Sequence, residues 1–147
     1  MARATETQQL VATQALSKVL TNNGIKHGIS GGFAVRLLGR NRRTVDVDIL
    51  IDMAADTRHD VTQLLVQNDV NIPVLHPAVL ILAKMKRCVY YIGSTRPQSI
   101  SKLHNDISDI RFILEWLVKH SEKVDFVGYQ STTADRLYKD TTDLVNH

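Results

Sequence analysis

The stretch SGGFAVRLLGRNRRTVDVDILID, residues 30–52, contains the pattern that decides the fold of this chain. Gly31 and Gly32 follow the segment IKHGIS, which resembles a short strand, and precede FAVRLLG, whose apolar residues recur at helical spacing. From Thr44 the period changes, because valine and isoleucine alternate mostly with aspartate, as in a strand with one apolar face. The stretch therefore predicts a strand, a glycine turn, a helix and a second strand adjacent to the first.

Asp46 and Asp48 stand two positions apart in the second of these strands. Side chains two residues apart on a strand point to the same face, with Cα atoms about 7 Å apart. Their carboxylates can therefore converge on a hard cation such as Mg²⁺, which binds a few carboxylates together with waters and substrate phosphates. The alternative is a strand whose aspartates face solvent, where two carboxylates cost little.

The two glycines and the basic residues around them suit an anionic ligand. Glycine lets the backbone approach a phosphate closely, and the hydroxyl of Ser30 adds a hydrogen-bond donor. Arginine side chains can contact the oxygens of a triphosphate or neutralise the carboxylates. The arginines of the stretch are Arg36, Arg40, Arg42 and Arg43. The alternatives are a tight turn without a ligand and a solvated basic surface.

The combination resembles the signature of the nucleotidyltransferase superfamily, which includes DNA polymerase beta and the CCA-adding enzymes. The residues that carry the resemblance are ISGGFAVRLLGRNRRTVDVDIL, with an arginine before Thr44 as the family often has. The resemblance implies an α+β fold. A small mixed β-sheet nucleotidyltransferase core packed with helices would span residues 1–75, and a helical C-terminal half would span 76–147.

The resemblance also implies an activity and a set of site residues. The family transfers an NMP group from an NTP to a hydroxyl acceptor, by in-line attack on the α-phosphate with release of pyrophosphate. The catalytic, metal-binding positions correspond to Asp46 and Asp48, which would hold two Mg²⁺ or Mn²⁺ ions. The nucleotide-binding positions correspond to Ser30, Gly31, Gly32 and Arg43.

A third carboxylate, which the family carries on another strand and which serves or orients the general base, has no clear counterpart. Residues 54–67 are predicted to form a helix, and Pro73 weakens the short segment NIPVL as a central strand. Asp125, in KVDFV, has the right local pattern but follows the helical half. The chain is therefore interpreted as a nucleotidyltransferase or, alternatively, as a catalytically impaired nucleotide-binding or protein-interaction module.

The apparent loss of a hairpin from the core also bears on assembly. A sheet of only two or three strands is marginal by itself and leaves an open edge. A second copy of the chain is the simplest cover for that edge, so the sequence predicts an isologous homodimer.

The remaining segments predict helices. Thr5 and Gln8 have the spacing of a capping box and begin an N-terminal helix. Its expected inward face consists of Ala12, Ala15, Leu16, Val19 and Leu20. Pro77 suits the first turn of a largely buried helix, and a last helix is capped by Ser131 or Thr132.

A long helix from Ser99 has the clearest helical period of the chain. Its expected inward residues are Ile100, Leu103, Ile107, Ile110, Leu114 and Leu117. Asp106 and Asp109 are then expected on its polar face, with Asp106 paired to Lys102 one turn earlier. Three cations of the preceding helix either extend to solvent or face nucleotide phosphates. They are Lys84, Lys86 and Arg87.

Composition narrows the choice of partners. The chain has 147 residues, of which 44% are hydrophobic and 22% charged, as in a globular domain. A net charge of +3 and an aromatic content of 5% argue against a nucleic-acid partner. The single cysteine, Cys88, excludes an internal disulfide and fits a reducing compartment. Without an apolar run of transmembrane length or a signal-peptide core, the expectation is a cytoplasmic protein with no membrane partner.

Overall fold

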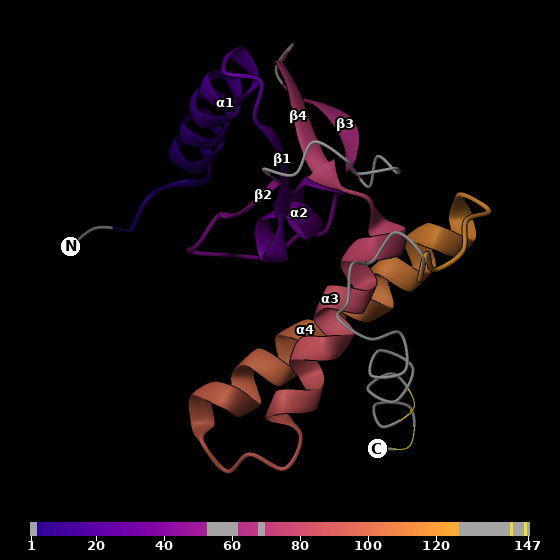
Figure 1. The fold of residues 1–147 in the computed structure, drawn as a ribbon. Coiled ribbons are helices and arrows are strands. Elements are labelled where there is room, and N and C mark those ends of the chain that lie inside the picture. The colour runs from indigo at the N-terminus through magenta and orange to yellow at the C-terminus, as the bar shows by residue number, and fades with distance from the viewer. Residues whose placement is uncertain (1–2, 53–61, 68–69, 127–141, 143–145, 147) are drawn as a thin grey trace. The chain divides into compact units, whose positions relative to one another are not determined.

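The computed structural model describes residues 3–52, 62–67, 70–126, 142 and 146. The chain divides into two compact units, Met1–His76 and Pro77–His147. Within the described residues, all strands belong to the first unit and the second unit is helical (Figure 1). Of the last helix predicted from the sequence, from Ser131 onward, only Thr142, which is helical, and Asn146 are among the described residues.

The first unit contains a four-stranded mixed sheet in the order β2-β1-β4-β3. The strands are β1 (Lys26–Ser30), β2 (Asp48–Asp52), β3 (Thr62–Gln67) and β4 (Val70–Leu75). β1 runs antiparallel to β2 and parallel to β4, while β3 and β4 form an antiparallel hairpin. The helix α1 (Glu6–Asn22) contacts β1 and β4, and α2 (Gly31–Leu37) contacts β1 and β2. A small mixed sheet packed with helices confirms the predicted α+β class.

The stretch over residues 30–52 folds as its pattern predicts, with one different boundary. β1 ends at Ser30, α2 begins at Gly31, and β2 returns beside β1. β2 begins at Asp48 instead of Thr44, because β1 is short and its last residue, Ser30, pairs with Asp48. Asp46 therefore lies in the loop before the strand, which corrects the prediction that both aspartates belong to it.

Residues 62–67 contradict the prediction of a helix over 54–67. They form β3, which pairs with β4 from Thr62↔Leu75 to Gln67↔Val70, whereas residues 53–61 lie outside the described residues. A short apolar segment fits both a helix and a strand, so the spacing of Leu64 and Leu65 could not decide between them. The hairpin that the sequence analysis considered missing is present.

β4 lies inside the sheet, between β1 and β3, although it contains Pro73. The expectation that this proline would keep the segment out of a central position is wrong. The ladder between β1 and β4 consists of the single pair Ile29↔Val74, so few bonds are needed on that side and a missing N–H is tolerated. With four strands, the premise of a reduced sheet is also wrong, and the homodimer stays a prediction.

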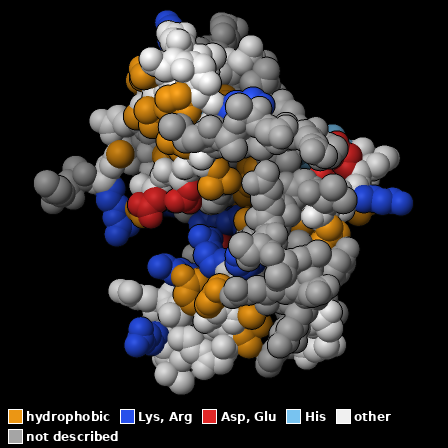
Figure 2. Space-filling view, viewed as in Figure 1, with side chains coloured by type: hydrophobic (Ala, Val, Ile, Leu, Met, Phe, Trp, Pro, Cys, Tyr) orange, Lys and Arg blue, Asp and Glu red, His pale blue; other side chains and the backbone are white. Residues whose placement is uncertain are grey.

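α1 begins with the predicted capping box but buries a different face. The backbone N–H of Gln8 donates to Thr5 Oγ1 at 3.3 Å, and the backbone N–H of Thr5 donates to Gln8 Oε1 at 2.8 Å. The buried residues are Gln9, Thr13, Ser17 and Leu20, so only Leu20 of the predicted inward residues is buried. Val11, Leu16 and Val19 are 57%, 45% and 56% exposed, and Figure 2 shows hydrophobic side chains at the surface around α1.

Hydrogen bonds explain why the polar face of α1 is the buried one. Ser17 Oγ and His27 Nε2 are 2.7 Å apart, and Nδ1 of the same ring is 2.9 Å from the carbonyl oxygen of Ile25. A neutral ring protonated at Nδ1 satisfies both contacts, donating to Ile25 and accepting from Ser17. Thr13 Oγ1 donates to the carbonyl oxygen of Gln9 at 2.7 Å. Buried polar groups that are bonded in this way cost little.

The second unit contains α3 (Pro77–Tyr91) and α4 (Pro97–Lys119), which pack on each other. Both helices agree with the sequence prediction, and residues 77–82 are buried as expected. Asp125 follows α4 in a connector, where its backbone N–H donates to the carbonyl oxygen of Ala78 at 2.9 Å. Among the described residues, no helix combines the length and the apolar character needed to cross a bilayer.

α4 buries a face that agrees only in part with the one that its apolar spacing predicts, since Ile110 and Leu117 are buried as expected. Its buried residues are Asp106, Asp109, Ile110, Ile113 and Leu117. Ile100, Ile107 and Leu114, which were expected inside, are 39%, 40% and 41% exposed. Asp106 and Asp109 are fully buried, so the prediction that they lie on the solvent-facing polar side of this helix is wrong. Asp106 pairs with Lys84 and Arg87 instead of Lys102.

Candidate functional site

The candidate site lies where β1 ends and β2 begins. The ladder places Ser30 opposite Asp48, so the glycine turn that follows Ser30 lies beside the first residue of β2. Ser30 is 8% exposed and its side chain does not cap α2, whereas Asp48 is exposed. Strand pairing therefore brings together predicted site residues from both ends of the stretch.

The carboxylate of Asp48 lies directly against Gly31. A Cβ atom at position 31 would be 1.9 Å from Asp48 Oδ2 and 2.9 Å from Asp48 Cγ, closer than Cβ atoms come to their neighbours. Gly31 also has a φ of 66°, a conformation that side chains other than glycine rarely adopt. Glycine is required here for both reasons, and the group that approaches its backbone is a carboxylate of the protein.

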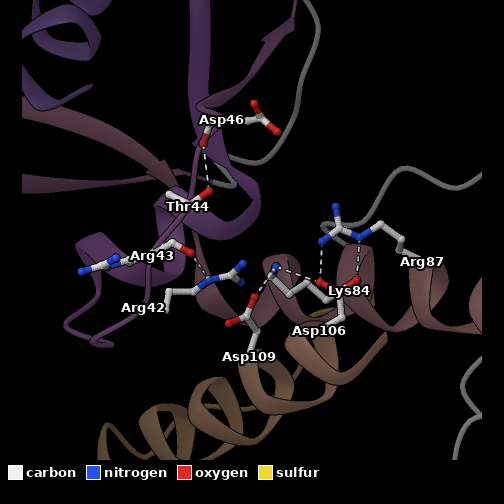
Figure 3. A network of polar contacts seen from close by, with 8 residues as sticks. All are labelled: Arg42, Arg43, Thr44, Asp46, Lys84, Arg87, Asp106 and Asp109. Atoms are coloured by element: carbon white, nitrogen blue, oxygen red, sulfur yellow. Dashed lines mark hydrogen bonds and ion pairs between the residues drawn. The ribbon is translucent and has the colours of Figure 1, made fainter. Parts of the chain in front are cut away.

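The guanidinium of Arg42 lies against Gly32. A Cβ atom at position 32 would be 3.0 Å from Arg42 Cζ and 3.1 Å from each of Nη1 and Nη2. Arg42 Nε donates to the carbonyl oxygen of Arg43 at 3.5 Å (Figure 3). The turn therefore carries an anionic group on its first glycine and a cationic group on its second.

Asp46 is held in the loop before β2. Its carbonyl oxygen accepts a hydrogen bond from Thr44 Oγ1 at 3.1 Å (Figure 3). The carbonyl oxygen of Thr44 accepts another from Gln9 Nε2 of α1 at 2.9 Å, so α1 helps to fix this loop. Asp46 is exposed, as Asp48 is, and both carboxylates can be reached by a cation.

The donor set fits a magnesium ion whose coordination a substrate completes. Mg²⁺ prefers oxygen ligands and usually takes one or two carboxylates together with waters and substrate phosphates. Among the residues that the structure describes, no three His, Cys, Asp or Glu side chains converge on one point. Asp48, at the start of β2, and Asp46, in the loop before it, are two exposed carboxylates of the kind that such an ion takes.

The two strands that follow β2 contain no third carboxylate. β3 has the sequence TQLLVQ and β4 has the sequence VNIPVL, and neither contains an acidic residue. Asp125, the weaker alternative, lies in the connector after α4 in the second unit. The general base implied by the resemblance has no counterpart in these strands.

The other arginines of the stretch have different surroundings. Arg36 ties α2 to α1, because its Nη2 is 3.3 Å from Glu6 Oε2. Its guanidinium also lies 5.3 Å from the centre of the Phe33 ring, within α2 itself. Burial lowers the pKa of the Arg40 guanidinium, which stays cationic at neutral pH. Arg43, which the resemblance implies in nucleotide binding, is exposed.

A cluster of charged side chains that the sequence pattern did not predict joins α3 and α4, and all of its members except the exposed Arg87 are buried. It consists of Lys84 and Arg87 from α3 with Asp106 and Asp109 from α4 (Figure 3). Lys84 Nζ is 2.6 Å from Asp109 Oδ2 and 3.3 Å from Asp106 Oδ1. Arg87 Nε donates to Asp106 Oδ2 at 2.6 Å, and Arg87 Nη2 donates to the other oxygen of that carboxylate. The sequence did contain a signal for this cluster. The two cations are three residues apart on one helix, and the two anions are three residues apart on the other, so each pair shares a helix face.

Cys88 is buried and follows Arg87 in the sequence. It is close enough to the cluster for the cluster's charges to act on its thiol. Burial raises the pKa of the Cys88 thiol to about 11, the Asp106 carboxylate adds to the rise, and the charges of Arg87 and Lys84 oppose it. A thiol in this state is protonated near neutral pH and is a poor nucleophile. The only cysteine of the chain is therefore a packing residue.

We predict that a thiol reagent at about pH 8 modifies Cys88 slowly in the folded protein and fully in denaturant. Folding raises this pKa from 9.0 to about 11, so the stability that the protonated thiol contributes is present below about pH 9 and is lost as the pH rises through 11. Urea midpoints across this range should fall more steeply for the wild type than for Cys88→Ala, which lacks the titrating group. Rapid labelling of the native protein would contradict the prediction.

Comparisons with known proteins bear on the fold. No protein-family model matches the chain, and no curated protein matches it significantly. A solved structure that is similar is that of an antigenic nucleotidyltransferase-like protein from Paracoccidioides brasiliensis, with a TM-score of 0.67 and 14% sequence identity. The match covers 99% of this chain and 90% of that protein. At this identity the likeness establishes the fold alone, and the chain has a nucleotidyltransferase-like α+β fold.

Proposed function

We propose that this chain transfers an NMP group from an NTP to a hydroxyl acceptor in a reaction that depends on Mg²⁺ or Mn²⁺. The observation that carries the proposal is the glycine turn, where the Asp48 carboxylate lies on Gly31 and the Arg42 guanidinium lies on Gly32. A divalent ion needs anionic ligands and a phosphate chain needs cationic donors, so this pair of neighbouring groups suits a metal–phosphate group. The nucleotidyltransferase-like fold supports the same chemistry.

The residues of the turn and the loop have separate parts in this proposal. Asp46 and Asp48 hold the divalent ion, which when bound polarises the phosphate under attack and offsets its charge. The small surface of Gly31 and Gly32 lets the Asp48 carboxylate and the Arg42 guanidinium lie close to the backbone, where the ion and the phosphates would bind. Ser30, at the end of β1, is a hydroxyl donor for the same group.

The acceptor hydroxyl must lose a proton, and the described part of β3 and β4 offers no carboxylate to take it. General-base help is typically worth about 10²–10⁴-fold in rate. This observation favours a second candidate function, a module on the same fold that binds NTP and transfers slowly or not at all. An assay of NMP transfer from labelled NTP, with Asp46→Ala and Asp125→Ala as variants, separates the two. Transfer that Asp46→Ala abolishes supports the enzyme, and binding without transfer supports the module.

We predict that Asp48→Asn weakens Mg²⁺-dependent NTP binding by about tenfold or more, equivalent to about 1.4 kcal/mol. Asparagine keeps the shape of the side chain against Gly31 but removes the charge that holds the ion. Calorimetric titration of each NTP, with and without Mg²⁺, measures the effect. Glu115→Gln is the matched control. Like Asp48→Asn it removes one negative charge, but from an exposed residue of α4. Equal affinity of wild type and Asp48→Asn in Mg²⁺ would remove Asp48 from the proposed site.

A further inference from the structure

We infer that Arg42, more than Arg43, is the residue that holds the phosphate chain at the glycine turn. The inference rests on the proposed function and departs from the sequence resemblance, which implies Arg43. Arg42 is the arginine whose guanidinium lies against the backbone of the turn. Arg43 is exposed and contributes its carbonyl oxygen to the Arg42 side chain.

The orientation of the Arg42 guanidinium follows from its distances to Gly32. Cζ, Nη1 and Nη2 are 3.0, 3.1 and 3.1 Å from the Cβ position of residue 32. Nearly equal distances from one point to three atoms of a planar group place that point over the face of the group. The guanidinium therefore lies face-on against Gly32, and its N–H donors, which lie in its plane, point along the surface of the turn and not into it.

This orientation suits a phosphate chain that runs along the turn. One residue away, the Asp48 carboxylate lies on Gly31, and neighbouring Cα atoms are about 3.8 Å apart. A phosphate bound to a divalent ion on Asp48 would therefore lie next to the residue that the Arg42 guanidinium covers, and the fork of that guanidinium matches two phosphate oxygens. Arg42 Nε also makes a long hydrogen bond, at 3.5 Å, with the Arg43 carbonyl oxygen.

The charges of the site also require a cation at this position. Asp46 and Asp48 repel an incoming triphosphate, and a divalent ion offsets only part of the combined negative charge. The guanidinium of Arg36 is engaged with Glu6 at 3.3 Å and with Gln9 Oε1 at 3.2 Å. Arg42 has its guanidinium against the glycine turn, next to the residue on which the Asp48 carboxylate lies, and would there offset part of the rest.

The inference also defines what Arg42 recognises. A guanidinium that contacts phosphate oxygens does not distinguish one base from another. Arg42 should therefore contribute equally to the binding of all four NTPs and of inorganic triphosphate. Choice among nucleotides, where it exists, would come from other residues.

The test compares Arg42→Gln, Arg43→Gln and the wild type in calorimetric titrations with inorganic triphosphate and with ATP, each with and without Mg²⁺. We expect Arg42→Gln to lose about tenfold or more in affinity for both probes, as for a charged hydrogen-bonding pair. Arg43→Gln should lose clearly less. Arg111→Gln is the control, because Arg111 is exposed on α4 and its replacement removes the same charge.

Gly32→Ala provides a second variant that leaves every charge in place. The added Cβ would lie 3.0–3.1 Å from the flexible end of Arg42, which would have to move by a few tenths of an ångström. We expect it to weaken binding of both probes while circular dichroism and the unfolding midpoint stay close to those of the wild type.

The outcomes separate this inference from the proposed function. ATP binding that survives Arg42→Gln unchanged, or that falls equally in Arg43→Gln, overturns the inference and leaves the proposed function standing. Arg42-dependent binding of inorganic triphosphate without any binding of an NTP upholds the role of Arg42 in phosphate binding and overturns the proposed function. A wild-type protein that binds neither probe overturns both.

Discussion

Replacing Lys84 with methionine is expected to lower the free energy of unfolding by about 3–5 kcal/mol. The Lys84 side chain is 2% exposed and its ammonium contacts two fully buried carboxylates, at 2.6 Å from Asp109 and 3.3 Å from Asp106. Methionine fills a similar volume but withdraws the cation that contacts both buried carboxylates. Urea denaturation followed by the fluorescence of Trp116, the only tryptophan of the chain and part of α4, measures the loss.

Two further variants test whether charge balance is the cause. Lys102→Met removes an exposed cation from α4 and should change stability by no more than about 0.5 kcal/mol. The double variant Lys84→Met with Asp109→Leu removes one cation and one anion and leaves Arg87 paired with Asp106, so it should recover most of the loss. A double variant no more stable than Lys84→Met would show that lost packing, and not an uncompensated charge, explains the effect.

The same cluster shows why the position of α4 was predicted correctly but its buried face only in part. The spacing of apolar residues locates α4, since a long periodic segment is a strong local signal. Its buried face depends on partners in α3 that the local pattern does not contain. Charged residues are placed at the surface by default, because burial without a partner is costly. Lys84 and Arg87 supply that partner, and Asp106 and Asp109 turn inward.

α1 and the hairpin illustrate two other limits of local patterns. The polar face of α1 is buried because Ser17 and Gln9 find hydrogen-bond partners outside the helix. These partners are His27 and Thr44. β3 is a strand because β4 is available as its partner. An asparagine and an aspartate stand between Gln67 and Val70, and such residues are common in short hairpin turns. That cue was available in the sequence.

In the candidate site, the sequence predicts the kinds of residues but not their contacts. Gly31, Gly32 and Asp48 can be recognised in the sequence. Two glycines precede a helical pattern, and an aspartate interrupts an otherwise apolar strand pattern. Their arrangement depends on the pairing of Ser30 with Asp48, which sets the carboxylate against Gly31. The choice of Arg42 over its neighbour depends on the path of the loop, and four arginines in one stretch look alike in the sequence.

The substitution Gly31→Ala is expected to affect both stability and the proposed binding. A left-handed backbone costs about 1–2 kcal/mol for a residue with a Cβ, and Gly31 has a φ of 66°. The added Cβ would also lie 1.9 Å from Asp48 Oδ2, so the carboxylate has to move, and overpacking of this kind typically costs about 1–3 kcal/mol. We expect a total loss of about 2–5 kcal/mol in urea denaturation. Calorimetry should show a loss of Mg²⁺-dependent NTP affinity at least as large as that of Asp48→Asn.

Gly24→Ala separates the two causes. Gly24 has a φ of 67°, almost the same as that of Gly31, but a Cβ there would meet no described atom within 4 Å. Gly24→Ala should therefore show the backbone cost alone, about 1–2 kcal/mol, and bind nucleotide and metal as the wild type does. The difference between the variants then measures the displacement of Asp48. Equal stability losses in both would show that the carboxylate moves aside at no cost. Unchanged metal-dependent binding in Gly31→Ala would mean that the position of Asp48 on the glycine turn has no part in holding the ion.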